Sequence, residues 1–375
     1  MSSDLFVILS EIPDPRYCRT KLHKLSDILF MTIFSMICGA TNWVEIHNIC
    51  IVQKNFLEDL LCFKNGIPSI STFQRALSTI NIKSLNKIIE SIALNINNSF
   101  KDKHISIDGK TLRGSGEINE KKSPFHTLNM FLTETSTVIR QYLGKDHASE
   151  MKMIPKILEG LDLKKSIITI DAAGCYEEVT DSIIKAGADY IIALKENQPI
   201  AMKEVLLLFS GIPINDDGTS IYQEITKEHG RIEDRSYISI DLNKYSIESI
   251  KKFNNINSVI RVNSVVERNG EQTQFFRYYI SSLNIDAKKQ GKIIRSHWGI
   301  ENSLHYVLDV VYYEDRNQTS IKNLATVFSG IRKTVINIIQ KEKKKGKTKH
   351  QITIEAIAHP EYVLEIMQNA FSKTD

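Results

Sequence analysis

The sequence predicts a mixed α/β protein in which helices cover both faces of a central sheet. Three observations predict it: apolar side chains recur at helical spacing over residues 20–97, β-branched runs alternate with helical segments over 103–209, and strand-forming residues dominate 219–283. Strands that alternate with helices build a layered structure, because each helix packs its apolar face onto the sheet. The expected domains are an N-terminal helical domain over 1–97 and an α/β domain over 98–375 with a β-rich insertion at about 215–285.

The composition is that of an ordinary globular protein and leaves several partner classes open. Lys and Arg number 48 against 44 Asp and Glu, and this difference of +4 (48 − 44) is compatible with nucleic acid without identifying it. The five cysteines form no CxxC pair, which argues against a zinc site or a disulfide framework and for a reducing cytoplasm.

Neither a membrane anchor nor a signal peptide is expected. The longest apolar stretch, residues 28–40, is too short to span a bilayer and contains Thr32 and Ser35. The N-terminus carries acidic residues and lacks a basic region ahead of an apolar one. We expect a cytoplasmic protein with no membrane partner.

The N-terminal helices include one segment with a recognisable outline. In NGIPSISTFQRAL, Gly66 and Pro68 predict a turn, Ser69 or Ser71 can cap a helix, and a short helix follows to Leu77. A turn that opens a short helix is the outline of a helix-turn-helix, but most such turns only connect helices. Contact with DNA and simple connection both remain open here.

The next elements follow from the change of period after residue 103. Their order is β-β-β-α-β-α-β, which is the element order of the ribonuclease-H-like fold, a mixed sheet with helices on both faces. The expected elements are a strand ending at Asp108-Gly109, a hairpin over 125–144, a helix at 151–161, a strand ending at Asp171, a helix at 176–188, a strand at 189–197 and a helix at 201–209.

The remaining chain is expected to hold the insertion and two further helices. Asn269-Gly270 predicts a hairpin turn within the β-rich stretch, and helices are expected at 296–309 and 321–340. The Lys-rich run KEKKKGKTKH at 341–350 is expected to be a solvated tail or loop, with phosphate contact as the alternative.

Two strand ends carry the chemistry. ISIDG and ITIDA each place a carboxylate, Asp108 and Asp171, directly after a buried β-branched run. Two carboxylates held together repel one another unless a cation is present, and Mg²⁺ prefers oxygen ligands. A third acid, Glu301, would complete a site for two divalent ions that act on a phosphodiester. Each Asp alone is also explained as a turn former.

Glu301 stands in SHWGIENSLHYVLD between two histidines at four-residue steps, so a helix stacks His297, Glu301 and His305 on one face. The two histidines lie two helical turns apart, about 12 Å, which is too far for one zinc ion. They are expected instead to orient Glu301, to contact a phosphate or to pack in the core.

These motifs resemble those of DDE transposases of the bacterial insertion-sequence group that includes the H-repeat-associated proteins. The matching stretches are IDGKTLRGS, ITIDAAGC, GADYIIALKENQ, HGRIEDR and RSHWGIENSLHYVLDVVYYED, together with the N-terminal DPRYCRTKLHKLSDILFMTIFSMICGATNW and NGIPSISTFQRAL. They run in order over nearly the whole chain. The resemblance implies a ribonuclease-H-like fold and metal-dependent cleavage at transposon ends, followed by attack of the 3′-hydroxyl on target DNA.

The resemblance also implies cofactors, partners and site residues. It implies two Mg²⁺ or Mn²⁺ ions held by Asp108, Asp171 and Glu301. Its partners would be the terminal inverted repeats, target DNA and further copies of the chain, as a homodimer or larger synaptic complex in the nucleoid. Expected DNA or phosphate contacts are Lys110, Arg113, Lys195, Arg231, Arg235, His297, Asn302 and His305, with a structural charge ladder as the alternative for the HGRIEDR arginines.

One departure from the group supports an alternative. The chain has HASEM where the group commonly has a Lys-Ser-Asn-Glu-Ile-like stretch, which places His147 and Ser149 at the Lys and Asn positions. The alternative function is therefore a catalytically degenerate transposase remnant that binds DNA without cleaving it. A third hypothesis is a nuclease of related fold that acts on other nucleic acids.

Overall fold

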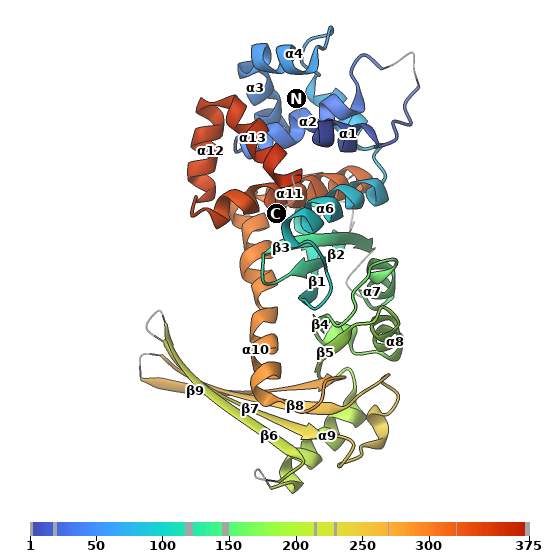
Figure 1. Cartoon of the computed structure of the whole chain (residues 1–375), viewed down its shortest axis with the longest axis vertical. Coiled ribbons are helices and arrows are strands. Elements are labelled where there is room, and N and C mark those ends of the chain that lie inside the picture. Colours follow the sequence, from blue (N-terminus) through green and yellow to red (C-terminus); the bar gives the residue numbers. More distant parts are fainter. Residues whose placement is uncertain are drawn as a thin grey trace. The chain divides into compact units, whose positions relative to one another are not determined.

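The computed structural model describes residues 3–17, 21–116, 123–144, 150–213, 216–228, 231–268, 270–319 and 321–371 (Figure 1). It separates into two compact units, each described below by itself. The first unit comprises Met1–Ser99, Gly109–His147 and Glu301–Asp375, and the second comprises Phe100–Asp108 and Ala148–Ile300.

The first unit is a helical assembly whose core joins both ends of the chain. The apolar α2 is buried nearly all round, as expected of a helix with apolar residues on every side. α11 packs against α2, α6 and α13, and Trp43 of α3 stacks on Phe328 of α11 with ring centroids 4.0 Å apart. The helices are α1 (Ser3–Ser10), α2 (Leu25–Ile37), α3 (Trp43–Val52), α4 (Lys54–Leu61), α5 (Ile70–Leu77), α6 (Ile82–Asn97), α11 (Lys322–Lys344), α12 (Lys349–Ala358) and α13 (Pro360–Phe371).

The helix-turn-helix outline predicted from the sequence is present as local structure. α5 follows α4 through a turn in which Gly66 has a φ of +68°, a value that glycine adopts without strain. The Ser69 hydroxyl caps α5 by accepting the N–H of Thr72 at 3.3 Å. Phe73 is buried while Arg75 is exposed, so α5 has one packed and one open face.

The expected hairpin is also present in the first unit. β2 (Phe125–Leu132) pairs with β3 (Thr137–Gly144) in antiparallel register. Asn337 of α11 fastens β3 by accepting the N–H of Val138 at 2.8 Å and donating to its carbonyl at 2.7 Å. The strand order in this unit is β3-β2-β1, where β1 (His104–Leu112) begins in the second unit.

The second unit contains the parallel strands and the β-rich insertion, in the order β1-β4-β5-β9-β8-β7-β6. β1, β4 and β5 are parallel, and β9 joins β5 in antiparallel register. In Figure 1, α7 and α8 lie on one side of β4 and β5, and α10 lies on the other. The bounds are α7 (Glu150–Leu158), β4 (Ile167–Ile170), α8 (Glu177–Lys185), β5 (Asp189–Leu194), α9 (Pro199–Gly211), β6 (Thr219–Glu228), β7 (Arg231–Asp241), β8 (Ser258–Arg268), β9 (Glu271–Ser281) and α10 (Ala287–His297).

This topology confirms the predicted fold class: a ribonuclease-H-like mixed sheet with helices on both faces, an all-β insertion and an N-terminal helical region. The hairpin predicted at residues 269–270 joins β8 to β9, with Arg268 opposite Glu271; Asn269 itself lies outside the described residues. His147 and Ser149 also lie outside them.

Three local expectations were wrong. β1 does not end at Asp108-Gly109 but continues to Leu112, where the carbonyl of Lys110 accepts the hydroxyl of Thr127 in β2. The Lys-rich run at 341–350 is mostly exposed, as expected, but only residues 345–348 form a loop, because α11 extends to Lys344 and α12 begins at Lys349. Glu342 on that last turn is buried and pairs with Lys345 at 2.6 Å. The third, the regular helix over 296–309, is described with the site below.

Candidate active site

Asp108 and Asp171 emerge side by side from neighbouring parallel strands. The pairing of β1 with β4 aligns Ser106 with Thr169 and Ile107 with Ile170, and Asp108 and Asp171 are the residues that directly follow this last pair. Side chains alternate between the two faces of a strand. Asp108 therefore shares a face of β1 with Ser106, and Asp171 follows the last residue of β4 at its carboxyl end.

The backbone after Asp171 is held by that side chain. Its Oδ1 accepts the N–H of Ala173 at 2.9 Å and opens the 3₁₀ turn Ala172–Gly174. A Cβ at Gly174 would lie 2.5 Å from Cγ2 of Ile170, so the turn requires glycine. Asp171 thus also forms a turn, which was the alternative explanation for this residue in the sequence. The turn fixes where its carboxylate lies.

Below the two aspartates, a polar cluster joins β1, β4 and α10. Thr169 Oγ1 lies 2.9 Å from Nε2 of His104, 3.2 Å from the hydroxyl of Ser106 and 2.8 Å from Nδ1 of His297. The hydroxyl of Ser296 lies 2.9 Å from Nδ1 of His104. This cluster fastens the last turn of α10 to β4, whose last residue directly precedes Asp171.

Because its two histidines are held neutral in the folded protein, we expect this cluster to make the protein less stable in mild acid. Burial, aided by His297, lowers the pKa of His104 to about 3, and burial lowers the pKa of His297 to about 4. The unfolded chain titrates near pH 6.5 and so binds protons that the folded chain does not. The free energy of unfolding is therefore highest above pH 6.5 and falls as the pH is lowered. At pH 5 we expect His104 to lower it by about 2 kcal/mol. The half-buried His297 should lower it by less.

Urea unfolding at pH 7, 6 and 5 measures this loss. The variant His104→Gln, which cannot take up a proton, should show a shallower pH dependence than the wild type. Equal pH dependence of the two proteins would contradict the expectation.

Glu301 is the first residue of the last segment of the first unit, and it is exposed. It lies four residues after His297, the last residue of α10. The helix predicted here is not a regular α-helix, because Glu301–His305 and Val307–Val311 form π-helical turns. Such turns are rare and occur often at functional sites. The α-helical stacking of His297, Glu301 and His305 expected from the sequence does not apply to this geometry.

In the first unit, Lys110 and Arg113 differ sharply in exposure. Lys110 is 7% exposed and its ammonium lies 2.6 Å from Oδ1 of Asp309 and 3.7 Å from Oδ1 of Asp315. The side chain of Arg113 is 81% exposed, with only a 3.7 Å approach to Asp315. Arg113 is therefore open to a phosphate, whereas the ammonium of Lys110 is already paired with carboxylates of its own unit. Asn302 is exposed and His305 half-buried on the π-helical turn.

In the second unit, the predicted basic residues fall into two classes. Lys195 directly follows β5 and is exposed. Arg235 of β7 is only 3% exposed and forms ion pairs with Glu233 and, at 3.7 Å, with Glu224. Arg231 lies 3.0 Å from Glu233. The geometry therefore favours a structural role for the HGRIEDR segment, in which its arginines pair with neighbouring carboxylates, over a row of phosphate contacts.

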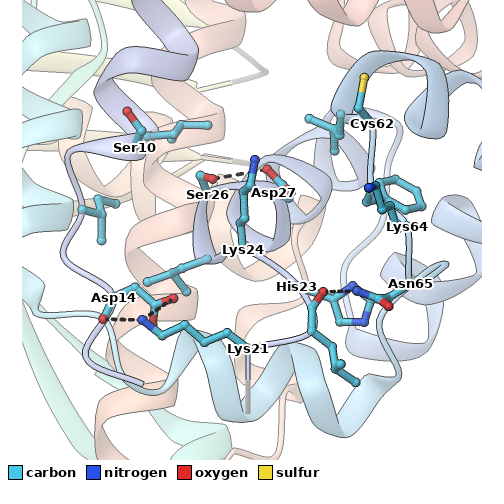
Figure 2. A pocket seen from close by; sticks show the side chains of 16 residues that line it. Ser10, Asp14, Lys21, His23, Lys24, Ser26, Asp27, Cys62, Lys64 and Asn65 are labelled. Carbon is cyan, nitrogen blue, oxygen red and sulfur yellow. Dashed lines mark hydrogen bonds and ion pairs between the residues drawn. The ribbon is translucent and has the colours of Figure 1, made fainter. Parts of the chain in front are cut away.

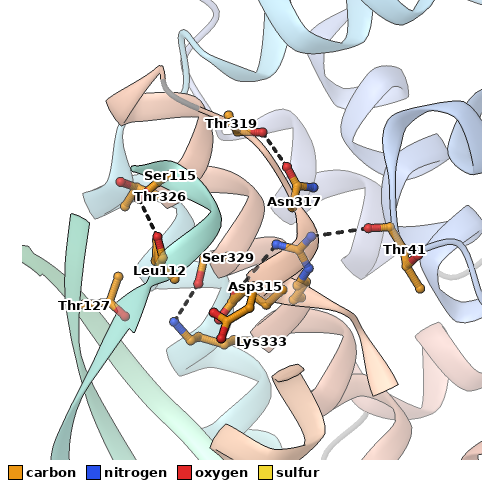
Figure 3. Close-up of polar contacts among 12 residues, drawn as sticks. Thr41, Leu112, Ser115, Thr127, Asp315, Asn317, Thr319, Thr326, Ser329 and Lys333 are labelled. Atoms are coloured by element: carbon orange, nitrogen blue, oxygen red, sulfur yellow. Dashed lines mark hydrogen bonds and ion pairs between the residues drawn. The ribbon is translucent and has the colours of Figure 1, made fainter. Parts of the chain in front are cut away.

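Sequence reasoning missed a buried charge cluster in the first unit, shown in Figure 3. Arg332 is fully buried, 3.7 Å from Oε1 of the equally buried Glu314. Its guanidinium carbon lies 4.0 Å from the ring centre of Phe328, and it donates to the carbonyl of Thr41 at 3.3 Å. Lys333 donates to Gln141 at 2.6 Å. Nothing in the helical pattern of 321–340 indicated two buried cations.

A separate pocket of about 570 Å³ lies among the N-terminal helices of the first unit (Figure 2). Lys21, Lys24 and Lys64 contribute to its lining. The ammonium of Lys21 is held by Asp14, at 3.5 Å from Oδ2 and 3.1 Å from the carbonyl. None of the site residues predicted from the sequence lines this pocket.

The donor set at Asp108 and Asp171 fits a hard divalent cation, because both side chains supply carboxylate oxygens. Among the described residues, no three or more His, Cys, Asp or Glu side chains gather as a metal-binding group. None of the described helices combines the length and apolar character that a bilayer span requires.

Comparison with known proteins identifies the relatives of this chain. Residues 99–338 match the family described as "Transposase DDE domain", and residues 6–92 match "DDE_Tnp_1-associated". Two proteins of Escherichia coli strain K12, putative protein YbfL and H repeat-associated putative transposase YhhI, are each 35% identical over 339 residues, covering 89% of this chain and 90% of the relative. A piggyBac transposase, solved as a synaptic complex with hairpin DNA, matches 99% of this chain and 84% of its own at 11% identity, with a TM-score of 0.44.

Proposed function

The chain belongs to the DDE transposases of the bacterial insertion-sequence group, and from this premise we propose that it cleaves DNA at the ends of an insertion sequence. The freed 3′-hydroxyl would then attack target DNA. The observation that supports this most is the register of β1 and β4, which ends with Ile107 opposite Ile170, the residues directly before Asp108 and Asp171.

The residues would divide the work as follows. Asp108 and Asp171 would hold divalent cations, with Glu301 as the third carboxylate, delivered by the segment that continues from α10. When bound, Mg²⁺ or Mn²⁺ supplies the positive charge that activates water and stabilises the leaving oxygen of a phosphodiester. The anchoring of His297 to Thr169 fixes the last turn of α10 within the second unit. His305 and Asn302 would adjoin that acid on its π-helical turn.

DNA contacts would come from exposed cations and from α5. Arg113 and Lys195 are open to phosphates, and α5 exposes Arg75. We further propose that two or more copies of the chain assemble on the paired transposon ends in the nucleoid.

Cleavage of the element's own terminal inverted repeats tests the proposal. The purified full-length protein, with Mg²⁺ or Mn²⁺, should nick terminal-repeat DNA in preference to shuffled DNA. Absence of nicking by the wild type, or undiminished nicking by Asp108→Asn, would reject it.

A DNA-binding remnant without catalysis is the second candidate, favoured by His147 and Ser149 in the HASEM segment. It would bind the terminal repeats and leave them intact with either metal. Preference for an RNA-containing duplex would instead favour the nuclease hypothesis.

Arg113 and Lys195 should each contribute one phosphate contact. We expect Arg113→Gln or Lys195→Gln to weaken binding to all DNA sequences alike and to reduce the slope of log K against log salt by about 1. Binding titrations between 50 and 200 mM salt, roughly the range over which such slopes are resolved, provide the measurement. Lys203→Gln, a change on α9, is the matched control. An unchanged slope in both test variants would contradict the assignment.

A further inference from the structure

The first part of β9 has one open edge. β8 pairs with the whole of β9, whereas β5 pairs only with its last residues, Tyr278–Ser281. Among the strands that the structure describes, none adjoins the other edge of residues 271–277. All seven of these residues are exposed, including the apolar Phe275 at 47% and Phe276 at 50%. Such an edge presents backbone N–H and C=O groups to which another strand can pair.

Alternate residues of β9 point their backbone groups towards the open edge. Asn257, directly before β8, donates its N–H to the carbonyl of Ser281 at 2.9 Å, whereas the N–H of Ser282 donates to the carbonyl of Tyr190 in β5 at 3.2 Å. Neighbouring residues of an antiparallel strand therefore bond to opposite sides, and the register of β8 with β9 has no shift over 271–281. Odd-numbered residues thus bond to β8. The residues that point both groups outward are Gln272, Gln274 and Phe276.

A second copy of β9 fits this edge in one register. Antiparallel pairing about a two-fold axis places one residue opposite itself. If that residue is Gln274, then Gln272 lies opposite Phe276 of the second copy, and every outward N–H and C=O of the stretch has a partner. Shifting the axis by one residue leaves Phe276 opposite the turn residue Gly270, or Gln272 opposite Tyr278, which β5 already holds.

The side chains suit the same register. Glu271 of one copy lies opposite Arg277 of the other at each end of the pairing, and opposite charges directly across two strands are stabilising. The guanidinium of Arg277 lies over the ring of Trp298, 5.7 Å from its centre, and the residue remains exposed. Thr273 lies opposite Phe275, and the two Phe275 rings are diagonal neighbours within reach of each other. The pairing would therefore cover an exposed aromatic side chain.

We propose that two copies of this chain associate through the open edge of β9, antiparallel and with Gln274 opposite itself. The inference rests on the proposed function for its purpose, because that function requires two or more copies on paired transposon ends. The association itself requires neither DNA nor metal. Since a single strand pair covers little area, it should be weak, and its measurement requires protein concentrations up to about 300 µM.

A cysteine on the axis tests the register. Cys18→Ser and Cys62→Ser provide the background, which removes the exposed thiol of Cys62. In that background Gln274→Cys should form a disulfide-linked dimer under mild oxidation, because opposed hydrogen-bonded residues have Cα atoms about 5.5 Å apart. Gln272→Cys is the matched control on the same edge. Its two copies would lie about 13 Å apart along the strands and should not crosslink at a comparable rate.

A charge swap tests the strength of the pairing. Sedimentation equilibrium of the full chain without DNA gives the dimer dissociation constant. Glu271→Arg or Arg277→Glu places like charges at both ends of the pairing, so each should weaken the dimer about tenfold or more. The double variant restores opposite charges and should recover most of the affinity. Gln274→Pro removes an outward N–H and should abolish the dimer, while urea unfolding shows whether the variant stays folded.

The outcomes separate this pairing from the proposed function. A wild type that stays monomeric, equal crosslinking of the two cysteine variants, or a double variant as weak as the single ones would overturn the pairing. A wild type that dimerises through β9 but cleaves no terminal-repeat DNA would reject the proposed function and leave the pairing. Cleavage by a protein that fails the crosslinking test would reject the pairing alone.

Discussion

Asp171→Asn should abolish metal-dependent nicking while leaving the protein folded. The amide keeps an oxygen that can accept the N–H of Ala173, so the 2.9 Å bond that opens the turn after β4 survives the change. What the substitution removes is the negative charge that would hold the cations. Metal-ion catalysis of this kind contributes several kcal/mol to the transition state, so the nicking rate should fall on the order of a thousandfold or more.

The measurement is a time course of terminal-repeat nicking with Mg²⁺ and with Mn²⁺. Asp162→Asn is the matched control, since Asp162 is an exposed residue of the same unit paired with Lys101 at 2.6 Å; this change should leave the fold and the nicking rate as they are in the wild type. Binding of Mn²⁺, followed by its paramagnetic resonance signal, gives a second readout that Asp171→Asn should weaken. A variant that nicks at the wild-type rate would remove Asp171 from the site.

The pair of aspartates was predictable because the information is local. ISID and ITID each place a carboxylate after a β-branched run, and parallel strands bring their carboxyl ends to one edge. The register, with Ile107 opposite Ile170, follows from those matched runs. The prediction that β1 ends at Asp108 was wrong because Asp-Gly is a turn signal only where no neighbouring strand continues the pairing, and here β2 does.

The rest of the site depends on contacts between distant segments. His104 and Thr169 are alternate-position polar residues in otherwise apolar strands, and that alternation was the available signal for a shared polar face. Their partners Ser296 and His297 lie over 120 residues further on, and no local pattern supplies that pairing. The π-helical turns after α10 are likewise invisible to periodicity, because the four-residue spacing of the polar residues fits an ordinary α-helix.

Arg332→Met should be the most destabilising change in the first unit. Burial lowers the pKa of Arg332 to about 10 despite the neighbouring Glu314 carboxylate, so the pair is held in a poorly solvated setting. Methionine keeps the apolar stem on the ring of Phe328 but leaves the carboxylate of Glu314 without its cation. Breaking a buried pair from one side typically costs 3–5 kcal/mol. We expect a loss of about 3 kcal/mol, at the lower end of this range. The reason is that Lys333 still interacts with the Glu314 carboxylate, which raises the pKa of Lys333.

The double variant decides whether the cost comes from the stranded charge. Glu314→Gln with Arg332→Met removes both charges, so it should recover most of the loss, since two neutral groups carry no uncompensated desolvation. Urea unfolding of the three variants gives the coupling free energy. Lys54→Met is the matched control, because Lys54 forms an exposed pair with Glu58 at 3.5 Å and should cost about 0.5 kcal/mol or less. A double variant as unstable as Arg332→Met alone would assign the loss to packing around Phe328 instead of to charge.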